Sequence, residues 1–153
     1  ELEPHGSVER LEMRGFFGRA AHQPRTNDFL HWRFEANPLW RYTIQRNEGA
    51  YVISRRTLLR GHDTLAIADV GWQPQREGDV KLLLRDAIGR ARAAGLRFAA
   101  TLATLSHPAM PMFVRGGFLP SPHRFRFLVN AFDPSLNIAR ARWGLSWADT
   151  DHL

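Results

Sequence analysis

Residues 65–102, LAIADVGWQPQREGDVKLLLRDAIGRARAAGLRFAATL, decide the fold. The stretch opens with a short β-rich run, 65–71, and a polar connection that contains glycine and proline follows. From residue 79 to 94 the apolar residues recur at helical spacing, and a second β-rich run, 98–102, comes directly afterwards. Strand, helix and strand in this order predict a crossover that joins two neighbouring parallel strands.

The helix expected over 79–94 has the clearest pattern in the chain. Asp79 is expected to cap its start, and Gly95 to supply the left-handed residue at its end. One apolar stripe is expected to pack on the sheet through Val80, Leu84, Ala87 and Ala91.

Upstream of this unit, β-rich runs alternate with turns. Short runs between residues 40 and 70 are separated by turn signals at 47–49 and 61–63, which predicts an antiparallel meander of three strands. Before the meander, a helix is expected over 7–21 and a second, shorter one from about residue 26 until Pro38.

Downstream, three more elements are expected. Ser106-His107-Pro108 is expected to cap a short helix that runs through Phe113 and ends at Gly116-Gly117. A strand is expected at 125–132, where large apolar residues alternate, and a last short strand at 143–147.

These elements add up to a single α/β (α+β) domain over residues 1–153. The sheet is expected to be mixed and mostly antiparallel, with six or seven strands, a central parallel pair and flanking helices. A chain of 153 residues is long enough to bury a core without disulfides or metals.

The composition excludes several kinds of function. The chain has no cysteine, which excludes disulfides, thiolate metal sites and cysteine nucleophiles and fits a reducing cytosol. No run approaches the ~20 apolar residues of a membrane span, so we expect a soluble cytoplasmic protein without a membrane partner. The histidines are dispersed without metal-ligand spacing and no Gly-x-Ser-x-Gly elbow occurs, so neither a metal site nor a serine hydrolase is expected.

The net charge of +6 raises the question of nucleic-acid binding. Lys81 is the single lysine among 21 basic residues, and the arginines are scattered from Arg10 to Arg142 rather than gathered in a run. No zinc-finger spacing or RNP-like motif accompanies them. Nucleic acid is therefore the weakest of the partners considered.

The order of elements over most of residues 40–132 resembles the GNAT superfamily of N-acyltransferases, and the segment 112–118, MFVRGGF, ends its helix in Gly-Phe as members of that family do. The resemblance implies that acetyl-CoA or another acyl-CoA is a substrate and that an unidentified amine accepts the acyl group. It also implies that the strand before the main helix offers backbone groups to pantetheine, while the next loop holds the pyrophosphate at the helix N-terminus. The coenzyme contacts would then come from Ala68, Val70, Trp72, Arg76, Gly78, Asp79, Val80, His107 and Phe113.

The loop departs from the family pattern at three positions. Glycine follows Arg76 after two positions where the family has three, and Val80 occupies the second small site. Asp79 adds a negative charge where phosphate would bind. A loop that only caps a helix and binds nothing is therefore an open alternative.

Acyl transfer to an amine needs a base for the amine and an acid for the leaving thiolate. Asp69 is the one acid on the strand before the loop and is the candidate base, with a hydrogen-bonded structural aspartate as the alternative. Phe113 stands where the resemblance implies a tyrosine acid, and a phenyl ring cannot donate a proton. Two functions stay open: an active N-acyltransferase, and a non-catalytic lobe that binds CoA or stabilises a partner lobe.

A narrower similarity lies outside these elements, to a poorly characterised group of GNAT-like proteins in which such a unit forms one half of a two-lobed chain. The chain begins at Glu1 rather than Met, as the C-terminal lobe of a longer chain would. We therefore expect it to pair with itself as a homodimer or with a second lobe. The residues that carry this similarity are 29–34 (FLHWRF), Asn37-Pro38, Tyr42, Trp143 and Asp149-Thr150-Asp151.

Overall fold

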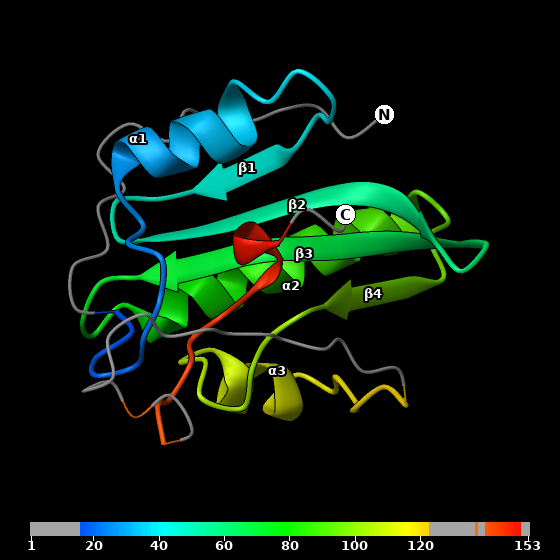
Figure 1. Cartoon of the computed structure of the whole chain (residues 1–153). Coiled ribbons are helices and arrows are strands. Elements are labelled where there is room, and N and C mark those ends of the chain that lie inside the picture. Colours follow the sequence, from blue (N-terminus) through cyan, green and yellow to red (C-terminus); the bar gives the residue numbers. More distant parts are fainter. Residues whose placement is uncertain (1–15, 123–136, 138–139, 151–153) are drawn as a thin grey trace.

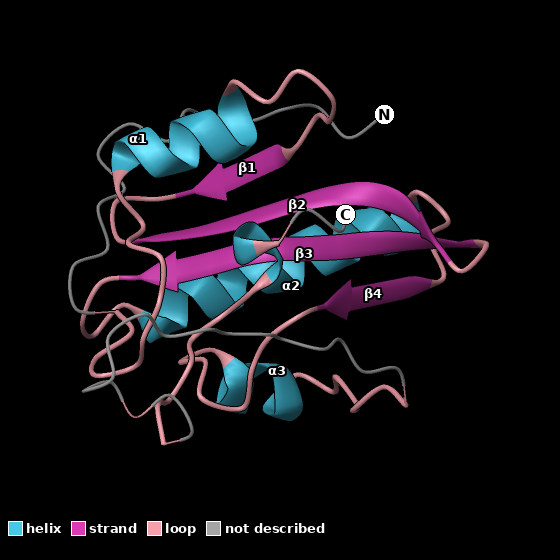
Figure 2. Cartoon of the chain, viewed as in Figure 1, coloured by secondary structure: helices cyan, strands magenta, loops and turns pink. Residues whose placement is uncertain are grey.

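The computed structural model describes residues 16–122, 137 and 140–150. Within these residues a four-stranded mixed sheet carries helices on both faces (Figures 1 and 2). The strands are β1 (Thr43–Arg46), β2 (Ala50–Leu59), β3 (His62–Trp72) and β4 (Phe98–Thr101), in this spatial order. The fold class expected from the sequence, a mixed and mostly antiparallel sheet with flanking helices, is confirmed, but the described residues form four strands rather than six or seven, and the parallel pair β3–β4 lies at one edge of this sheet.

The predicted crossover is present. β1, β2 and β3 pair antiparallel, and β3 and β4 pair parallel, with Thr64 opposite Phe98 and Ile67 opposite Thr101. Helix α2 (Glu77–Ala93) joins the two parallel strands and packs on β2 and β3. Figure 1 shows α2 on one face of the sheet and the short helix η2 (Trp147–Asp149) on the other.

Tight turns hold the meander in register. The β2–β3 hairpin turns at Arg60 and Gly61, which have φ of 50° and 79°. Two successive residues with positive φ are typical of the hairpin turns that match the twist of paired strands. At the β1–β2 turn, the Asn47 side chain accepts the N–H of Gly49. Both turns lie where the sequence predicted them or one residue before.

A bulge interrupts the alternation of β3. Ile53 lies opposite Asp69 but Ser54 lies opposite Ile67, so Ala68 is an extra residue on β3. Such a bulge turns two successive side chains to the same face of the sheet. Ala68 and Asp69 accordingly face the side of η2, whereas Ile67 and Val70 pack in the core under α2.

Two cores lie on opposite faces of the sheet. The one under α2 includes all four residues of the predicted stripe of that helix, together with residues of α3 (Met110–Arg115). The other lies under α1 (Asn27–Leu30), the π-helical turn η1 (His31–Glu35) and η2. Burying a large aliphatic or aromatic side chain contributes roughly 1.5–3 kcal/mol, so both faces stabilise the sheet.

Helix α2 begins earlier than predicted. It begins at Glu77, its cap residue Arg76 has no capping side-chain bond, and Asp79 lies inside the first turn. The prediction that Asp79 caps this helix was therefore wrong. The other end agrees with the prediction: Gly95 has φ of 81°, and Leu96 N–H donates to the carbonyl of Ala91.

Other expected elements differ in extent. The predicted cap at Ser106 was wrong, because α3 begins at Met110. The last strand expected at 143–147 consists of two isolated bridges, at Trp143 and Ser146, followed by η2. The helix expected over 7–21 and the strand at 125–132 fall mostly or wholly outside the described residues. Within the part described, no helix has the length and apolarity needed to cross a bilayer.

Candidate functional site

The candidate coenzyme site lies where β3 and β4 separate. Parallel pairing ends at Ile67 and Thr101, where the Thr101 hydroxyl donates to the Ile67 carbonyl at 3.0 Å. β3 continues for five further residues, 68–72, which we call the β3 edge, and α2 begins after a short loop. Val70 and Trp72 pack in the same core as Val80 of the first turn of α2, whereas Ala68 packs in the core on the other face of the sheet.

The loop between β3 and α2 presents one cation and one anion. The Arg76 guanidinium forms an ion pair with the Asp79 carboxylate at 2.6 Å, and the Arg76 side chain is 46% exposed. The Arg76 stem crosses Gly49, where an added Cβ would lie 2.6 Å from Arg76 Nε. A Cβ at Gly78 would meet nothing within 4 Å, so no described residue fills the space beside this position in the first helical turn. Val80 is buried in the core, and so are Ala68 and Val70 of the β3 edge.

Asp69, the candidate base, is buried and fully engaged in hydrogen bonds. One carboxylate oxygen accepts from Arg25 Nε at 2.8 Å and from the Tyr51 hydroxyl at 2.9 Å. The other accepts from the Ser146 hydroxyl at 2.7 Å and from Arg25 Nη2 at 3.3 Å. The side chain of Asp69 is 0% exposed. A carboxylate held in this way serves as an ion-pair partner, and it has no lone pair directed at an incoming amine.

Arg25 is the centre of this buried polar cluster. Besides Asp69, its guanidinium donates to both carboxylate oxygens of Asp149 at 2.8 Å, to the Ser146 hydroxyl at 3.1 Å and to the carbonyl of Gln23 at 2.8 Å. Burial alone would lower the pKa of Arg25, but Asp69 and Asp149 outweigh it and the pKa lies above its ordinary value. The guanidinium therefore stays charged, and it ties the N-terminal segment to β3 and to η2.

Tyr51 and Ser146 complete the cluster. Burial raises the pKa of Tyr51 well above its ordinary value, and the charge of Asp69 adds to this effect. Ser146 and Asp149 form a capping box at the start of η2. The Ser146 hydroxyl accepts the N–H of Ala148 at 3.1 Å, and the Asp149 carboxylate accepts the N–H of Ser146 at 2.8 Å. The Ser-x-x-Asp spacing at 146–149 was the one sequence signal that could have located this part of the cluster.

His107 lies in the loop before α3 and is 2% exposed. Its Nδ1 accepts the backbone N–H of Ala109 at 3.1 Å, which fixes the loop before α3. Burial lowers the pKa of His107 to about 4, so the imidazole is neutral near pH 7. Phe113 is also buried, and its ring packs 5.2 Å from that of Phe118.

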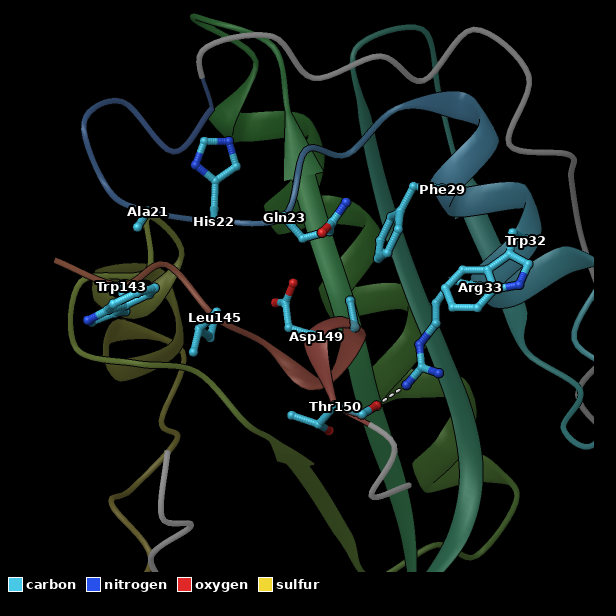
Figure 3. A pocket seen from close by; sticks show the side chains of 11 residues that line it. Ala21, His22, Gln23, Phe29, Trp32, Arg33, Trp143, Leu145, Asp149 and Thr150 are labelled. Carbon is cyan, nitrogen blue, oxygen red and sulfur yellow. Dashed lines mark hydrogen bonds between the residues drawn. The ribbon is translucent and has the colours of Figure 1, made fainter. Parts of the chain in front are cut away.

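A separate pocket of about 420 Å³ opens on the face of the sheet that carries η2. Figure 3 shows Phe29 and Trp32 on one side of it and Trp143 on the other, with Asp149 between them. Arg33 donates to the carbonyl of Thr150 at its edge. None of the predicted coenzyme residues lines this pocket. Several of its lining residues, among them Trp32, Trp143 and Asp149, carry the narrower similarity seen in the sequence, but the sequence did not predict that they form a pocket.

The cluster and the pocket are built from chain segments that lie far apart in the sequence. No group of His, Asp or Glu among the described residues could hold a metal ion. The residues of these sites that the sequence did not single out are Arg25, Gln23, Tyr51 and Ser146, whereas Asp149 was named only for the narrower similarity and not as part of a site.

No protein family and no curated protein matches the chain. Among solved structures, a mutant form of TTHA1254 from Thermus thermophilus superposes with a TM-score of 0.53 at 15% identity, over 84% of this chain and 96% of that chain. An acetyltransferase from Trypanosoma brucei matches at 20% identity with a TM-score of 0.39, over 52% of this chain and 57% of that chain. The first likeness shows a shared fold, and the second is too slight to carry an argument.

Proposed function

We propose that the chain is a GNAT-like lobe that binds acyl-CoA along the β3 edge, with little or no acetyl transfer of its own. The observation that carries the proposal is the separation of β3 from β4 after Ile67 and Thr101, directly beside the N-terminus of α2. An unpaired strand edge offers backbone groups to the amides of pantetheine, and a helix N-terminus attracts phosphate. Arg76 adds a positive charge at the same end.

The weak or absent catalysis follows from two side chains. Asp69 accepts hydrogen bonds from three residues and lies beside the guanidinium of Arg25, so it is a poor base for an amine. Phe113 has no proton to donate and lies in the core. An acid or base in the right place contributes typically 10²–10⁴-fold to a rate, and both are missing from the expected positions.

Calorimetric titration with acetyl-CoA and CoA tests the binding proposal. Arg76→Ala should weaken binding about tenfold, because a hydrogen bond to a charged group contributes roughly 1.5–3 kcal/mol and this side chain is half exposed. Asp79→Asn removes the anion that pairs with Arg76, so the affinity should hold or rise. Arg56→Ala is the matched control, because this arginine pairs with Asp63 elsewhere on the surface. Absence of binding by the wild type at millimolar ligand would contradict the proposal.

The second candidate function is an active N-acyltransferase, and the pocket lined by Phe29, Trp32 and Trp143 favours it. The pocket opens on the face of the sheet that also carries Asp69, and its volume of about 420 Å³ suits a small acceptor amine. Release of free thiol from acetyl-CoA, measured with a panel of amines, tests this candidate. If turnover is found, Trp32→Ala should raise KM for the amine and leave the affinity for CoA unchanged.

We also propose that the lobe pairs with a second copy of itself or with a further lobe. Three large apolar side chains of one segment are exposed: Trp32 at 66%, Leu39 at 77% and Trp40 at 46%. A stable contact should bury more than ~1,000 Å² in total. Sedimentation at rising protein concentration measures the pairing, and a strict monomer throughout would argue against self-association.

A further inference from the structure

Two aromatic rings from the N-terminal segment lie on residues that the proposed coenzyme site needs. The ring centroid of Phe16 lies 4.6 Å from that of Trp72 and 6.0 Å from that of His107. Phe17 lies 5.2 Å from His107. Trp72 is the last residue of the β3 edge, so Phe16 lies against this end of the edge and Phe17 lies against the neighbouring His107.

The side chain beneath this pair has an unused hydrogen-bond donor. His107 Nδ1 accepts a backbone N–H, so the proton of the neutral imidazole is on Nε2. Nε2 is buried, and no described residue accepts a hydrogen bond from it. An unsatisfied buried donor is costly, and a site that served packing alone would not need it.

The ring of Phe17 contacts the ring of His22 at 4.4 Å and the Arg25 guanidinium at 5.2 Å, and the backbone that follows it pairs with the C-terminal segment. The N–H of Ala21 donates to the carbonyl of Arg142, and the N–H of Gly144 donates to the carbonyl of Ala21. Gly144 leaves the space that Phe17 occupies, since a Cβ there would lie 2.5 Å from the ring. Gly18, with φ of 55°, forms the turn between the two rings and the fastened residues. A change of backbone angles at this turn would move the rings and leave the anchor at Ala21 in place.

We propose that Phe16 and Phe17 form a displaceable cover over Trp72 and His107, and that acyl-CoA displaces this cover and brings a carbonyl oxygen to His107 Nε2. The inference rests on the proposed function. A neutral, desolvated N–H donor selects an amide or thioester carbonyl and offers nothing to a cation. The N-terminal segment and the ligand therefore compete for one surface, which makes the segment an autoinhibitory contact.

The double variant Phe16→Ala/Phe17→Ala removes the competitor. When the binding-competent state is a minor one, the apparent affinity falls by its fraction, so removing the cover should tighten acetyl-CoA binding about tenfold. Phe98→Ala is the matched control, because this half-exposed ring lies at the start of β4 next to His62. Titration calorimetry gives the affinities, and thermal unfolding shows that each variant is folded.

Two substitutions at position 107 distinguish the role of Nδ1, which accepts a backbone N–H, from that of Nε2. His107→Asn keeps an acceptor for the N–H of Ala109 and lacks the Nε2 donor, so it should weaken acetyl-CoA binding about tenfold. His107→Gln places an amide donor near the position of Nε2 and should retain most of the affinity. Equal binding by His107→Asn and the wild type would overturn the role of Nε2.

Movement of the cover has a readout that does not depend on the alanine variants. The chain has no cysteine, so Arg19→Cys introduces a single exposed site for a fluorophore in the turn. Saturating acetyl-CoA should change the emission of this label, whereas a label at Arg60→Cys, in the β2–β3 turn, should not respond.

The outcomes distinguish the cover from the proposed function. Tighter binding by the double variant, or binding by the double variant alone, supports both. Binding by the wild type with unchanged or weaker affinity in a folded double variant, together with a silent label at position 19, overturns the cover and leaves the proposed function intact. No binding by any variant at millimolar ligand overturns both.

Discussion

The ring of Tyr51 occupies the space that a side chain at position 71 would need. Tyr51 and Gly71 are partners across β2 and β3, and a Cβ on Gly71 would lie 2.5 Å from Cε1 of the tyrosine. The glycine lets the ring lie flat on the sheet, so that the hydroxyl reaches Asp69 at 2.9 Å. The absence of a side chain at position 71 therefore lets Tyr51 join the buried polar cluster around Arg25 and Asp69.

Gly71→Ala is therefore expected to destabilise the protein. The added methyl group must displace a fully buried ring, and overpacking of this kind costs typically 1–3 kcal/mol. Gly89→Ala is the matched control, because a Cβ there meets nothing within 4 Å on the exposed side of α2 and should stabilise the helix by about 0.5–1 kcal/mol. Urea denaturation of the two variants compares them. Equal stabilities would contradict the account of Tyr51.

Removing Arg25 should be more damaging than removing any exposed arginine. Arg25→Met leaves the carboxylates of Asp69 and Asp149 buried without their cation, and breaking a buried ion pair costs on the order of 3–5 kcal/mol. Adding Asp69→Asn to this variant should restore part of the loss, which a double-mutant cycle measures. Arg56→Met, which breaks an exposed pair with Asp63, should change little. Additive losses in the cycle would show that Arg25 and Asp69 are not coupled.

The crossover unit could be predicted from the sequence because its signals are local. The apolar stripe of α2, the glycine at position 95 and the turn before β3 act through residues a few positions away, where propensity and spacing decide the structure. The start of α2 was misplaced because Asp79, a good capping residue, pairs with Arg76 instead. An aspartate near the start of a helix can either cap the helix or form an ion pair within its first turn, so it does not fix the first helical residue.

The candidate site could be predicted only in part, because tertiary contacts build it. Arg25 lies 44 residues from Asp69 and 124 from Asp149, and an ion pair leaves no periodic trace in a sequence. The bulge at Ala68 turns Asp69 into the cluster, and nothing in the local sequence marks it. The sequence placed His107 in the first turn of the short helix, whereas it lies in the loop before α3, and its burial under Phe16 and Phe17 depends on the N-terminal segment.

Acid should destabilise the protein through His107. Burial lowers the pKa of the folded imidazole from 6.5 to about 4. The charge of Arg25 also lowers this pKa, whereas the charges of Asp69 and Asp149 raise it. The unfolded chain therefore binds a proton that the folded one does not, and this contribution to stability is complete above about pH 6.5 and is lost as the pH falls towards 4. The loss is on the order of 3 kcal/mol.

Urea denaturation between pH 7 and 4 measures this effect. The free energy of unfolding of the wild type should fall more steeply than that of His107→Asn, which keeps the acceptor for Ala109 and does not titrate. Parallel pH profiles for the two proteins would show that another group carries the acid sensitivity.

The position of Phe113 leads to the last prediction. A tyrosine there would add a hydroxyl to the core beneath α2, where the ring already packs against Phe118 and is 3% exposed. Burying a hydroxyl without a partner costs about 1–3 kcal/mol by mutational data, so Phe113→Tyr should lower the free energy of unfolding by that amount. It should not raise release of thiol from acetyl-CoA, because the hydroxyl would lie in the core and not at the β3 edge. Phe118→Tyr, at a half-buried ring of the same pair, is the control and should cost less. A Phe113→Tyr protein that is as stable as the wild type and faster in thiol release would show instead that position 113 reaches the ligand.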